Sequence, residues 1–186
     1  MISSSPPVPG RTVYLVGCAA PPVRALHELI ALVHEEAWSV CVIPTPVAAT
    51  WIDQAALAAQ TGNTVRSYQR HPDEPSALPT ASAVVVVPAT FNTINKWASG
   101  ISDTFALGIL NETLGLGLPI VVFPHAKPAL TSHPAFATNV STLRACGVRF
   151  AATNAVEPVS AGQPFRWSPV IAALRGLEDP APGDSS

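Results

Sequence analysis

Hydrophobic positions follow two different periods along the chain. Short apolar runs occupy residues 11–17, 39–45, 81–90, 118–124 and 148–152. Longer segments with apolar positions at helical spacing lie between these runs, over residues 21–38, 46–60, 94–115 and 133–147. Short runs of this kind are typical of strands, and strands that alternate with helices predict an α/β domain. Its sheet should be mostly parallel and doubly wound.

The third apolar run is the most informative. Residues 84–87 read VVVV, without a polar position, which indicates a strand buried on both faces in a parallel sheet covered by helices. Such sheets bind ligands at the carboxyl ends of their strands, where the first turns of the following helices offer unpaired N–H groups. The candidate site therefore comprises the turns at residues 17–22, 44–48, 88–93 and 124–127.

Length and composition favour one compact unit. A chain of 186 residues with 48% hydrophobic residues can form a single core, which we place over residues 12–176. The proline-rich ends predict a flexible leader over residues 1–11 and a flexible tail over residues 177–186. A third proline-rich stretch, residues 71–79, predicts an excursion loop.

Charge and cysteine content exclude several classes of protein. The net charge of −2 and the absence of a basic run among 10 Lys and Arg residues argue against nucleic-acid binding. No apolar run reaches the roughly 18 residues of a membrane span, and no signal-peptide pattern is present. Cys18, Cys41 and Cys146 form no paired motif, so we expect buried free thiols in a cytoplasmic protein. The histidines lack paired ligand spacing, and no metal is predicted.

The first two turns leave their chemistry open. The stretch VGCAAPP, residues 16–22, lacks a GxGxxG fingerprint for a dinucleotide. Ala19 and Ala20 would still allow a ligand to approach the backbone closely, although a tight turn without a ligand is equally consistent with this stretch. Thr45 stands at the start of the second helical segment, where its hydroxyl could cap the helix or bind a phosphate.

The third and fourth turns carry two motifs in register. The stretch PATFNTINKWASGISDTFAL, residues 88–107, resembles the signature of the homo-oligomeric flavin-containing cysteine decarboxylases, which include phosphopantothenoylcysteine and lantibiotic peptidyl-cysteine decarboxylases. The stretch PHAKPALTSHPA, residues 124–135, matches a second motif of the same family. The matching positions are Pro88, Ala89, Thr90, Asn92, Thr93, Lys96, Gly100, Ile101 and Asp103 in the first motif, and Pro124, His133, Pro134 and Ala135 in the second.

This resemblance implies an FMN-binding, Rossmann-like domain with three α/β/α layers. Family members assemble as homotrimers or multiples of trimers, with the flavin near a subunit contact. Small side chains would admit the flat ring, and Thr and Asn would supply the few directed hydrogen bonds that such sites need. The implied contacts are Ala19, Ala20 and Thr45 at the phosphate, and Ala89, Thr90, Asn92 and Thr93 along the ring and ribityl chain.

The implied substrate site departs from the family pattern. Decarboxylating members use a histidine upstream of the third strand, where this chain has Glu74 with His71 nearby. They use an asparagine in the second motif, where this chain has Lys127 next to His125–Ala126. The cysteine of the family's C-terminal flap has no counterpart after residue 147. We therefore expect an altered substrate site whose catalytic candidates are Lys127, His125 and His71.

Two functions from different classes follow from this comparison. In the first, the protein is an FMN-dependent decarboxylase or oxidoreductase for a small molecule or peptide: the flavin oxidises a thiol-bearing carbon, and the resulting thioaldehyde loses carbon dioxide. In the second, it is an FMN-binding regulatory or protein-interaction module without decarboxylase activity, like relatives that inhibit a phosphatase. Flavin prenyltransferases share the fold, but their third turn differs, which makes flavin modification the weakest alternative.

Overall fold

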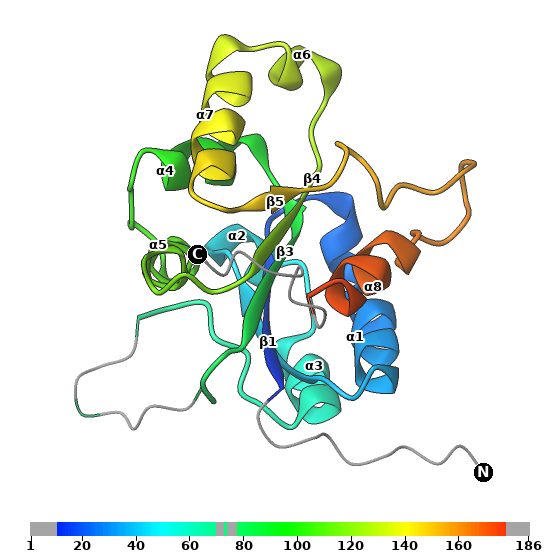
Figure 1. Cartoon of the computed structure of the whole chain (residues 1–186). Helices are drawn as coiled ribbons and strands as arrows, with labels where there is room; N and C mark the ends of the chain where they lie inside the picture. The colour runs from blue at the N-terminus through cyan, green and yellow to red at the C-terminus, as the bar shows by residue number, and fades with distance from the viewer. Residues whose placement is uncertain (1–10, 70–72, 74–77, 178–186) are drawn as a thin grey trace.

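A five-stranded parallel sheet forms the centre of the molecule. The structure, a computed structural model, describes residues 11–69, 73 and 78–177. The strands are β1 (Thr12–Gly17), β2 (Ser39–Pro44), β3 (Ala83–Ala89), β4 (Ile120–Pro124) and β5 (Arg149–Phe150). They lie in the order β2-β1-β3-β4-β5 and every pairing is parallel (Figure 1). The chain thus winds outward from β1 in both directions, which confirms the predicted doubly wound α/β fold.

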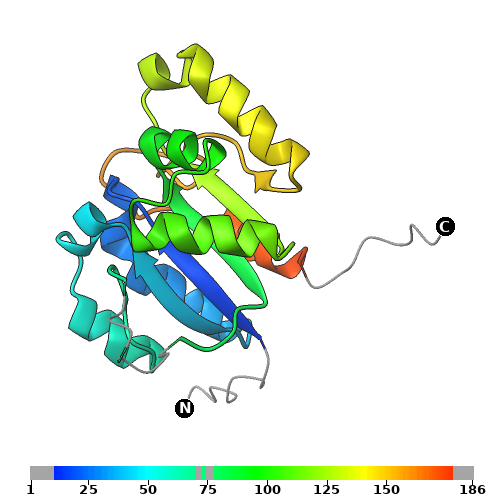
Figure 2. The same cartoon turned by 90° about the vertical axis from the view of Figure 1, so that its left-hand side faces the viewer.

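Helices cover both faces of the sheet and make three layers (Figures 1 and 2). One face carries the 3-10 helix η1 (Pro21–Ala25), α1 (Leu26–Glu35), α3 (Gln54–Thr61) and α8 (Ser168–Arg175). The other carries α4 (Phe91–Ala98), α5 (Phe105–Gly115) and α7 (Pro134–Ala145). Two short helices, α2 (Pro46–Ala49) and α6 (Pro128–Thr131), follow the carboxyl ends of β2 and β4.

Side chains of the central strands alternate between two apolar cores. On β1, Val13 and Leu15 pack with α1, whereas Tyr14 and Val16 pack with α5 and α7. All residues of β3 are buried, as the valine run predicts. Burial on both faces leaves the strand ends as the places where side chains can meet a ligand.

Two of the predicted helical segments are each divided into two helices. Residues 46–60 form α2 and α3, because the Asp53 side chain caps α3 by accepting a hydrogen bond from Ala56 N. Residues 94–115 form parts of α4 and α5, because Gly100 adopts a φ of 71° and the Thr104 hydroxyl caps α5. The apolar spacing continues across both breaks, so local capping decided the boundaries. The sequence prediction also missed α6 and α8.

Several further expectations concern the chain ends and the cysteines. The predicted leader and tail lie outside the described residues, apart from Arg11 and Leu177, so these boundaries stay predictions. Cys18 and Cys41 are buried, as expected. The same expectation was wrong for Cys146, which is exposed because it terminates α7 on the outer surface.

Within residues 11–69, 73 and 78–177, the helices are too short or too polar to cross a bilayer. The same ranges contain no cluster of three or more His, Cys, Asp or Glu side chains that could hold a metal ion.

Candidate functional site

Backbone hydrogen bonds join the carboxyl ends of four strands, and the segment that follows β5, into one continuous edge. Each bond continues the parallel pairing beyond the strands themselves, so the four predicted turns lie side by side in the order of the strands. The bonds run from Thr45 N to Gly17 O (2.8 Å), from Cys18 N to Pro88 O (2.9 Å), from His125 N to Ala89 O (2.8 Å) and from Asn154 N to Pro124 O (2.8 Å). We call this edge, from Thr45 to Asn154, the carboxyl edge.

A small hydrogen-bond network ties the first turn to the third. Thr90 precedes α4 and its hydroxyl accepts a long hydrogen bond from Thr93 N, at 3.5 Å. The hydroxyls of Thr90 and Thr93 are 3.1 Å apart, and the Cys18 thiol donates to Thr93 Oγ1 at 3.3 Å. Burial raises the pKa of the Cys18 thiol, which keeps it protonated as a donor. Thr93 is consequently fixed and buried, whereas Thr90 stays partly accessible.

Three polar side chains on the carboxyl edge are available to a ligand. The Thr45 hydroxyl does not cap α2, although Thr45 is the residue that precedes this helix. Asn92 and Lys127 are exposed. In the described part of the chain, none of these three side chains forms a hydrogen bond or ion pair. Each could bind a ligand without giving up an interaction within the protein.

The alanines predicted at the site contribute their small size. Ala19 is partly exposed, whereas Ala20 and Ala89 are buried. Ala20 N donates to Cys18 O, so this N–H group is not free for a ligand. The structure thus brings all seven predicted cofactor contacts to one edge, and their role toward a cofactor stays a prediction.

The fourth turn is held by Asn154, which the sequence reading missed. Ala126 N donates to Asn154 Oδ1 at 3.1 Å, and Asn154 Nδ2 donates to Ala126 O at 3.2 Å. The side-chain amide therefore pairs with the Ala126 peptide as a neighbouring strand would. Asn154 has a φ of 60°, a left-handed conformation that asparagine tolerates better than most residues. The sequence offered one signal, the pair Thr153–Asn154 after a strand. The residue that Asn154 bonds, Ala126, is 28 residues away in sequence, so the sequence did not reveal the pairing.

His125 lies partly buried beside the same turn. Its side chain is 15% exposed, and Nε2 is 3.7 Å from Glu157 Oε1. Burial lowers the pKa of His125, and the nearby Glu157 carboxylate raises it by a smaller amount. The imidazole is therefore neutral at physiological pH, and its buried Nδ1 has no hydrogen-bond partner in the described residues. His71, the third catalytic candidate, lies outside the described residues.

The remaining motif residues hold the loop that joins α4 to α5. The Lys96 ammonium pairs with the Asp103 carboxylate, and Asn111 Nδ2 donates to Ile101 O at 3.1 Å. These contacts fix residues 99–104, between α4 and α5, and leave Ile101 41% exposed. His133 caps α7, since its Nδ1 accepts a hydrogen bond from Ala135 N, and this agrees with the structural position expected at a helix start.

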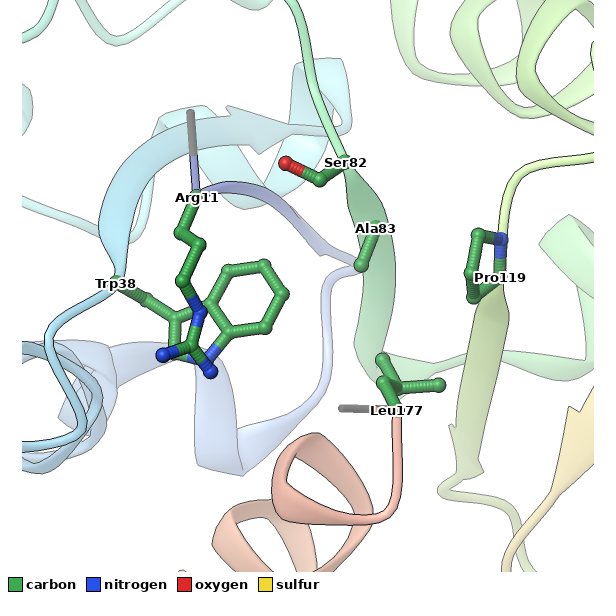
Figure 3. A pocket seen from close by; sticks show the side chains of 6 residues that line it. All are labelled: Arg11, Trp38, Ser82, Ala83, Pro119 and Leu177. Carbon is green, nitrogen blue, oxygen red and sulfur yellow. The ribbon is translucent and has the colours of Figure 1, made fainter. Parts of the chain in front are cut away.

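Two cavities in the structure lie elsewhere. The larger, about 350 Å³, opens at the amino ends of β1, β3 and β4, where the Arg11 guanidinium lies 4.8 Å from the centre of a Trp38 ring (Figure 3). The other, about 230 Å³, lies between β4, β5 and α8. Neither borders the carboxyl edge, although ligands of parallel α/β sheets bind at that edge. Topology therefore points to the carboxyl edge, where the Asn92 and Lys127 side chains are exposed, as the place for a ligand.

Comparison with known families decides the kind of protein. The model of the Flavoprotein family matches residues 12–175. The chain belongs to the Flavoprotein family. The match spans every strand of the sheet and all four turns of the carboxyl edge, which confirms the resemblance drawn from the two motifs.

Solved structures share the flavoprotein fold. A PPC decarboxylase variant complexed with pantothenoylaminoethenethiol superposes with a TM-score of 0.72 and 16% identity, covering 90% of this chain and 98% of that one. The FMN-dependent cysteine decarboxylase SpaF has a TM-score of 0.70 and 23% identity, covering 91% and 98%. The FMN binding protein AtHal3 has a TM-score of 0.72 and 16% identity, covering 90% and 96%. At these identities the comparison establishes the fold.

One curated relative matches part of the chain. The coenzyme A biosynthesis bifunctional protein CoaBC of Thermococcus kodakarensis is 37% identical over 70 residues. This segment is 38% of the present chain and spans only 17% of the relative.

Replacing Asn154 should separate the two ways in which it holds the fourth turn. Asn154→Ala loses both side-chain hydrogen bonds and strains the left-handed backbone, so we expect the free energy of unfolding in urea to fall by about 2–4 kcal/mol. Asn154→Gly loses only the hydrogen bonds, so its free energy of unfolding should fall by about 1–2 kcal/mol. Equal stability of the alanine variant and the parent would contradict the bracing role.

Acidification should destabilise the protein through His125. Its pKa in the folded state is below the ordinary 6.5, so the unfolded state binds the proton more readily. This contribution to stability is complete above pH 6.5 and is lost as the pH falls through 6.5 toward the folded-state pKa. Burial of His34 acts in the same direction.

The pH effect can be measured with His125→Gln. Urea unfolding between about pH 8 and pH 5 should show a smaller loss of stability in this variant than in the parent protein. His27→Gln is the matched control, because His27 is an exposed histidine on α1. Parallel pH profiles for His125→Gln and the parent would show that His125 is not responsible.

Proposed function

We propose that this flavoprotein binds FMN across its carboxyl edge and uses it in a reaction on a small-molecule or peptide substrate. The observation that carries the proposal is the uncommitted Thr45 hydroxyl, which stands beside the first turn and does not cap its own helix. The family membership and the FMN named for two structural neighbours support the choice of cofactor.

The phosphate would lie between the first and second turns. Thr45 offers a hydroxyl, and its N–H group is bonded to Gly17 O, which holds the two turns together. Ala19 and Ala20 carry no side chain that would obstruct an approaching phosphate. Hydrogen bonds to a phosphate are stronger than those between neutral groups, so one free hydroxyl contributes substantially to affinity.

The ring and the ribityl chain would follow the third turn. Ala89 contributes only a small side chain at the end of β3, and the partly accessible Thr90 and exposed Asn92 offer directed hydrogen bonds. Thr93 is 5% exposed and bonded to Cys18 and Thr90, so we assign it an indirect part, fixing the Thr90 hydroxyl.

The proposed chemistry uses residues of the fourth turn. Bound FMN supplies oxidation of the substrate carbon. Lys127 stands where decarboxylating relatives have an asparagine, and its ammonium can pair with a substrate carboxylate as a point charge. His125 is neutral and lies next to Glu157, so it can hold or release a proton there. His71 stays a third candidate without a described position.

Assembly into a homo-oligomer completes the proposal. The Asn92 and Lys127 side chains of the carboxyl edge are exposed in one chain, and a second copy would shield bound FMN from water. Ile101 supports a contact between copies, because the ion pair of Lys96 and Asp103 fixes this exposed apolar side chain in place. We propose a trimer or a multiple of trimers in the cytoplasm, the compartment that the free cysteines favour.

A regulatory module that binds FMN without catalysis is the second candidate. The substitution of Lys127 for the expected asparagine favours it, since an ammonium lacks the fixed geometry of an amide. The likeness to a structure described as an FMN binding protein is consistent with it.

Removal of the Thr45 hydroxyl should weaken FMN binding selectively. Purified protein should show the visible bands of an oxidised flavin after dialysis or after addition of FMN. For Thr45→Val we expect an FMN dissociation constant about 10-fold to 100-fold higher, from the loss of one hydrogen bond to a charged group. Riboflavin, which has no phosphate, should bind the variant and the parent equally.

A control variant lies at the other end of the same short helix. The Thr50 hydroxyl already donates to Val47 O at 2.8 Å, so Thr50→Val should leave the FMN dissociation constant unchanged. A parent protein that is colourless and fails to bind added FMN would overturn the proposal.

The role of Lys127 can be tested by turnover. With FMN bound, and with dissolved oxygen present to reoxidise the reduced flavin after each turnover, we expect carbon dioxide release from a peptide ending in cysteine or from an N-acyl cysteine of small size. Lys127→Met should reduce kcat/KM about 10-fold to 100-fold through loss of one charged contact, while leaving the FMN dissociation constant unchanged. Lys127→Arg, which keeps the charge, should retain part of the activity.

The outcome also separates the two candidate functions. Equal turnover by Lys127→Met and the parent would remove Lys127 from the mechanism. A parent that binds FMN tightly but releases no carbon dioxide from either substrate class would favour the regulatory module.

A further inference from the structure

Arg66 is a buried cation without an acceptor in the described part of the chain. It is 7% exposed, and its Nε is buried with no hydrogen-bond partner. Within residues 11–69, 73 and 78–177, no hydrogen bond or ion pair reaches its guanidinium. The guanidinium makes a cation–π contact with the Phe105 ring, whose centre is 5.9 Å from the guanidinium carbon. A ring face compensates only part of the hydration that a buried guanidinium loses.

Arg66 lies beside the sheet near its carboxyl edge. Its N–H donates to Val42 O at 3.2 Å, so the chain at this point runs along β2, close to the end of that strand at Pro44. Val65 packs into the core on the α1 face. Arg66 points to the opposite face, where it meets Phe105, the first residue of α5.

The amino end of α5 adds to the positive potential around Arg66. Thr104 satisfies two N–H groups of this helix, with its hydroxyl bonded to Leu107 N and its carbonyl to Gly108 N. The N–H groups of Phe105 and Ala106 have no acceptor among the described residues. Unpaired N–H groups and the helix dipole favour an anion at this position, whereas the protein places a cation there.

Two described acidic side chains on or beside α5, Asp103 and Glu112, do not pair with Arg66. Asp103 precedes α5, but its carboxylate is paired with Lys96. Glu112 lies on α5 beyond its second turn and forms no ion pair in the described structure. Within residues 11–69 and 78–177, a cation and a helix amino end thus converge without a carboxylate that pairs with either.

We propose that Arg66 and the first turn of α5 form a binding site for an oxyanion, the phosphate or carboxylate group of a small molecule. A guanidinium presents several N–H donors in one plane, which suits such a group. The site lies on the β2 side of the carboxyl edge and needs neither FMN nor turnover to be detected. The oxyanion could be the phosphate of FMN or an acidic group of another ligand, such as a substrate.

The test compares thermal unfolding of flavin-free protein in inorganic phosphate and in chloride at equal ionic strength. Phosphate should raise the unfolding temperature of the parent by about 5 °C more than that of Arg66→Met. The general stabilising effect of phosphate on proteins acts equally on both and cancels in this difference. In chloride alone, Arg66→Met should unfold at the same temperature or higher, because an unpaired buried charge has been removed.

Arg144 provides a matched control. Its guanidinium carbon also lies over an aromatic ring, 5.6 Å from the centre of Phe150, but Arg144 is exposed. In Arg144→Met, phosphate should raise the unfolding temperature over that in chloride by as much as in the parent, and we call this rise the phosphate effect. Arg66→Lys, which retains the charge, should keep part of the effect and serves as the test if Arg66→Met fails to fold.

Two results would contradict the proposal that Arg66 binds an oxyanion. One is a phosphate effect of the same size in the parent and in both Arg66 variants. The other is a lower unfolding temperature of Arg66→Met in chloride together with an undiminished phosphate effect, which would make Arg66 purely structural. Because this assay uses flavin-free protein, its failure leaves the FMN proposal, tested through Thr45, unaffected.

Loading with flavin identifies the source of the oxyanion. If FMN abolishes the phosphate effect and riboflavin does not, the oxyanion is the phosphate of FMN. If the phosphate effect persists with either flavin bound, the site serves a second acidic ligand. Both results support an oxyanion site at Arg66 and assign its occupant.

Discussion

Parallel pairing of β1 with β3 is the constraint on which the candidate site depends. In a parallel sheet all strands end at the same edge, so the turns that follow β1, β2, β3 and β4 must be neighbours. The backbone bonds from Thr45 to Gly17 and from Cys18 to Pro88 extend this pairing into the turns themselves. The valines of β3 make the arrangement stable, because they bury apolar surface on both faces of the sheet.

Polar groups at the carboxyl edge divide into those that fix the backbone and those left for a ligand. Thr93 and Asn154 are committed to hydrogen bonds within the protein, and each joins segments that are distant in sequence. Thr45 and Lys127 make no such bonds in the described structure. This division is typical of binding sites, where a rigid frame presents a few uncommitted groups and lowers the entropy lost on binding.

Cationic side chains lie on the β2 side and at the fourth turn of the edge, and the Glu157 carboxylate lies beside His125. Burial keeps His125 neutral, Lys127 projects an ammonium from the fourth turn, and Arg66 brings a guanidinium to the β2 side. A flavin phosphate and an acidic substrate are both anions, so this distribution would attract the proposed ligands from either end of the edge.

The sequence by itself determined the fold class, the four turns and the flavoprotein family, because valine runs, proline positions and two long motifs are local patterns. The family resemblance of its motifs also pointed to seven cofactor contacts, which lie at or next to the ends of strands and whose role toward a cofactor stays a prediction. Only the tertiary structure decided that Asn154 braces Ala126, that Cys18 bonds Thr93, and that Arg66 is buried against Phe105. These contacts join residues from separate elements, and their partners are chosen by sheet order and burial, which no local spacing encodes.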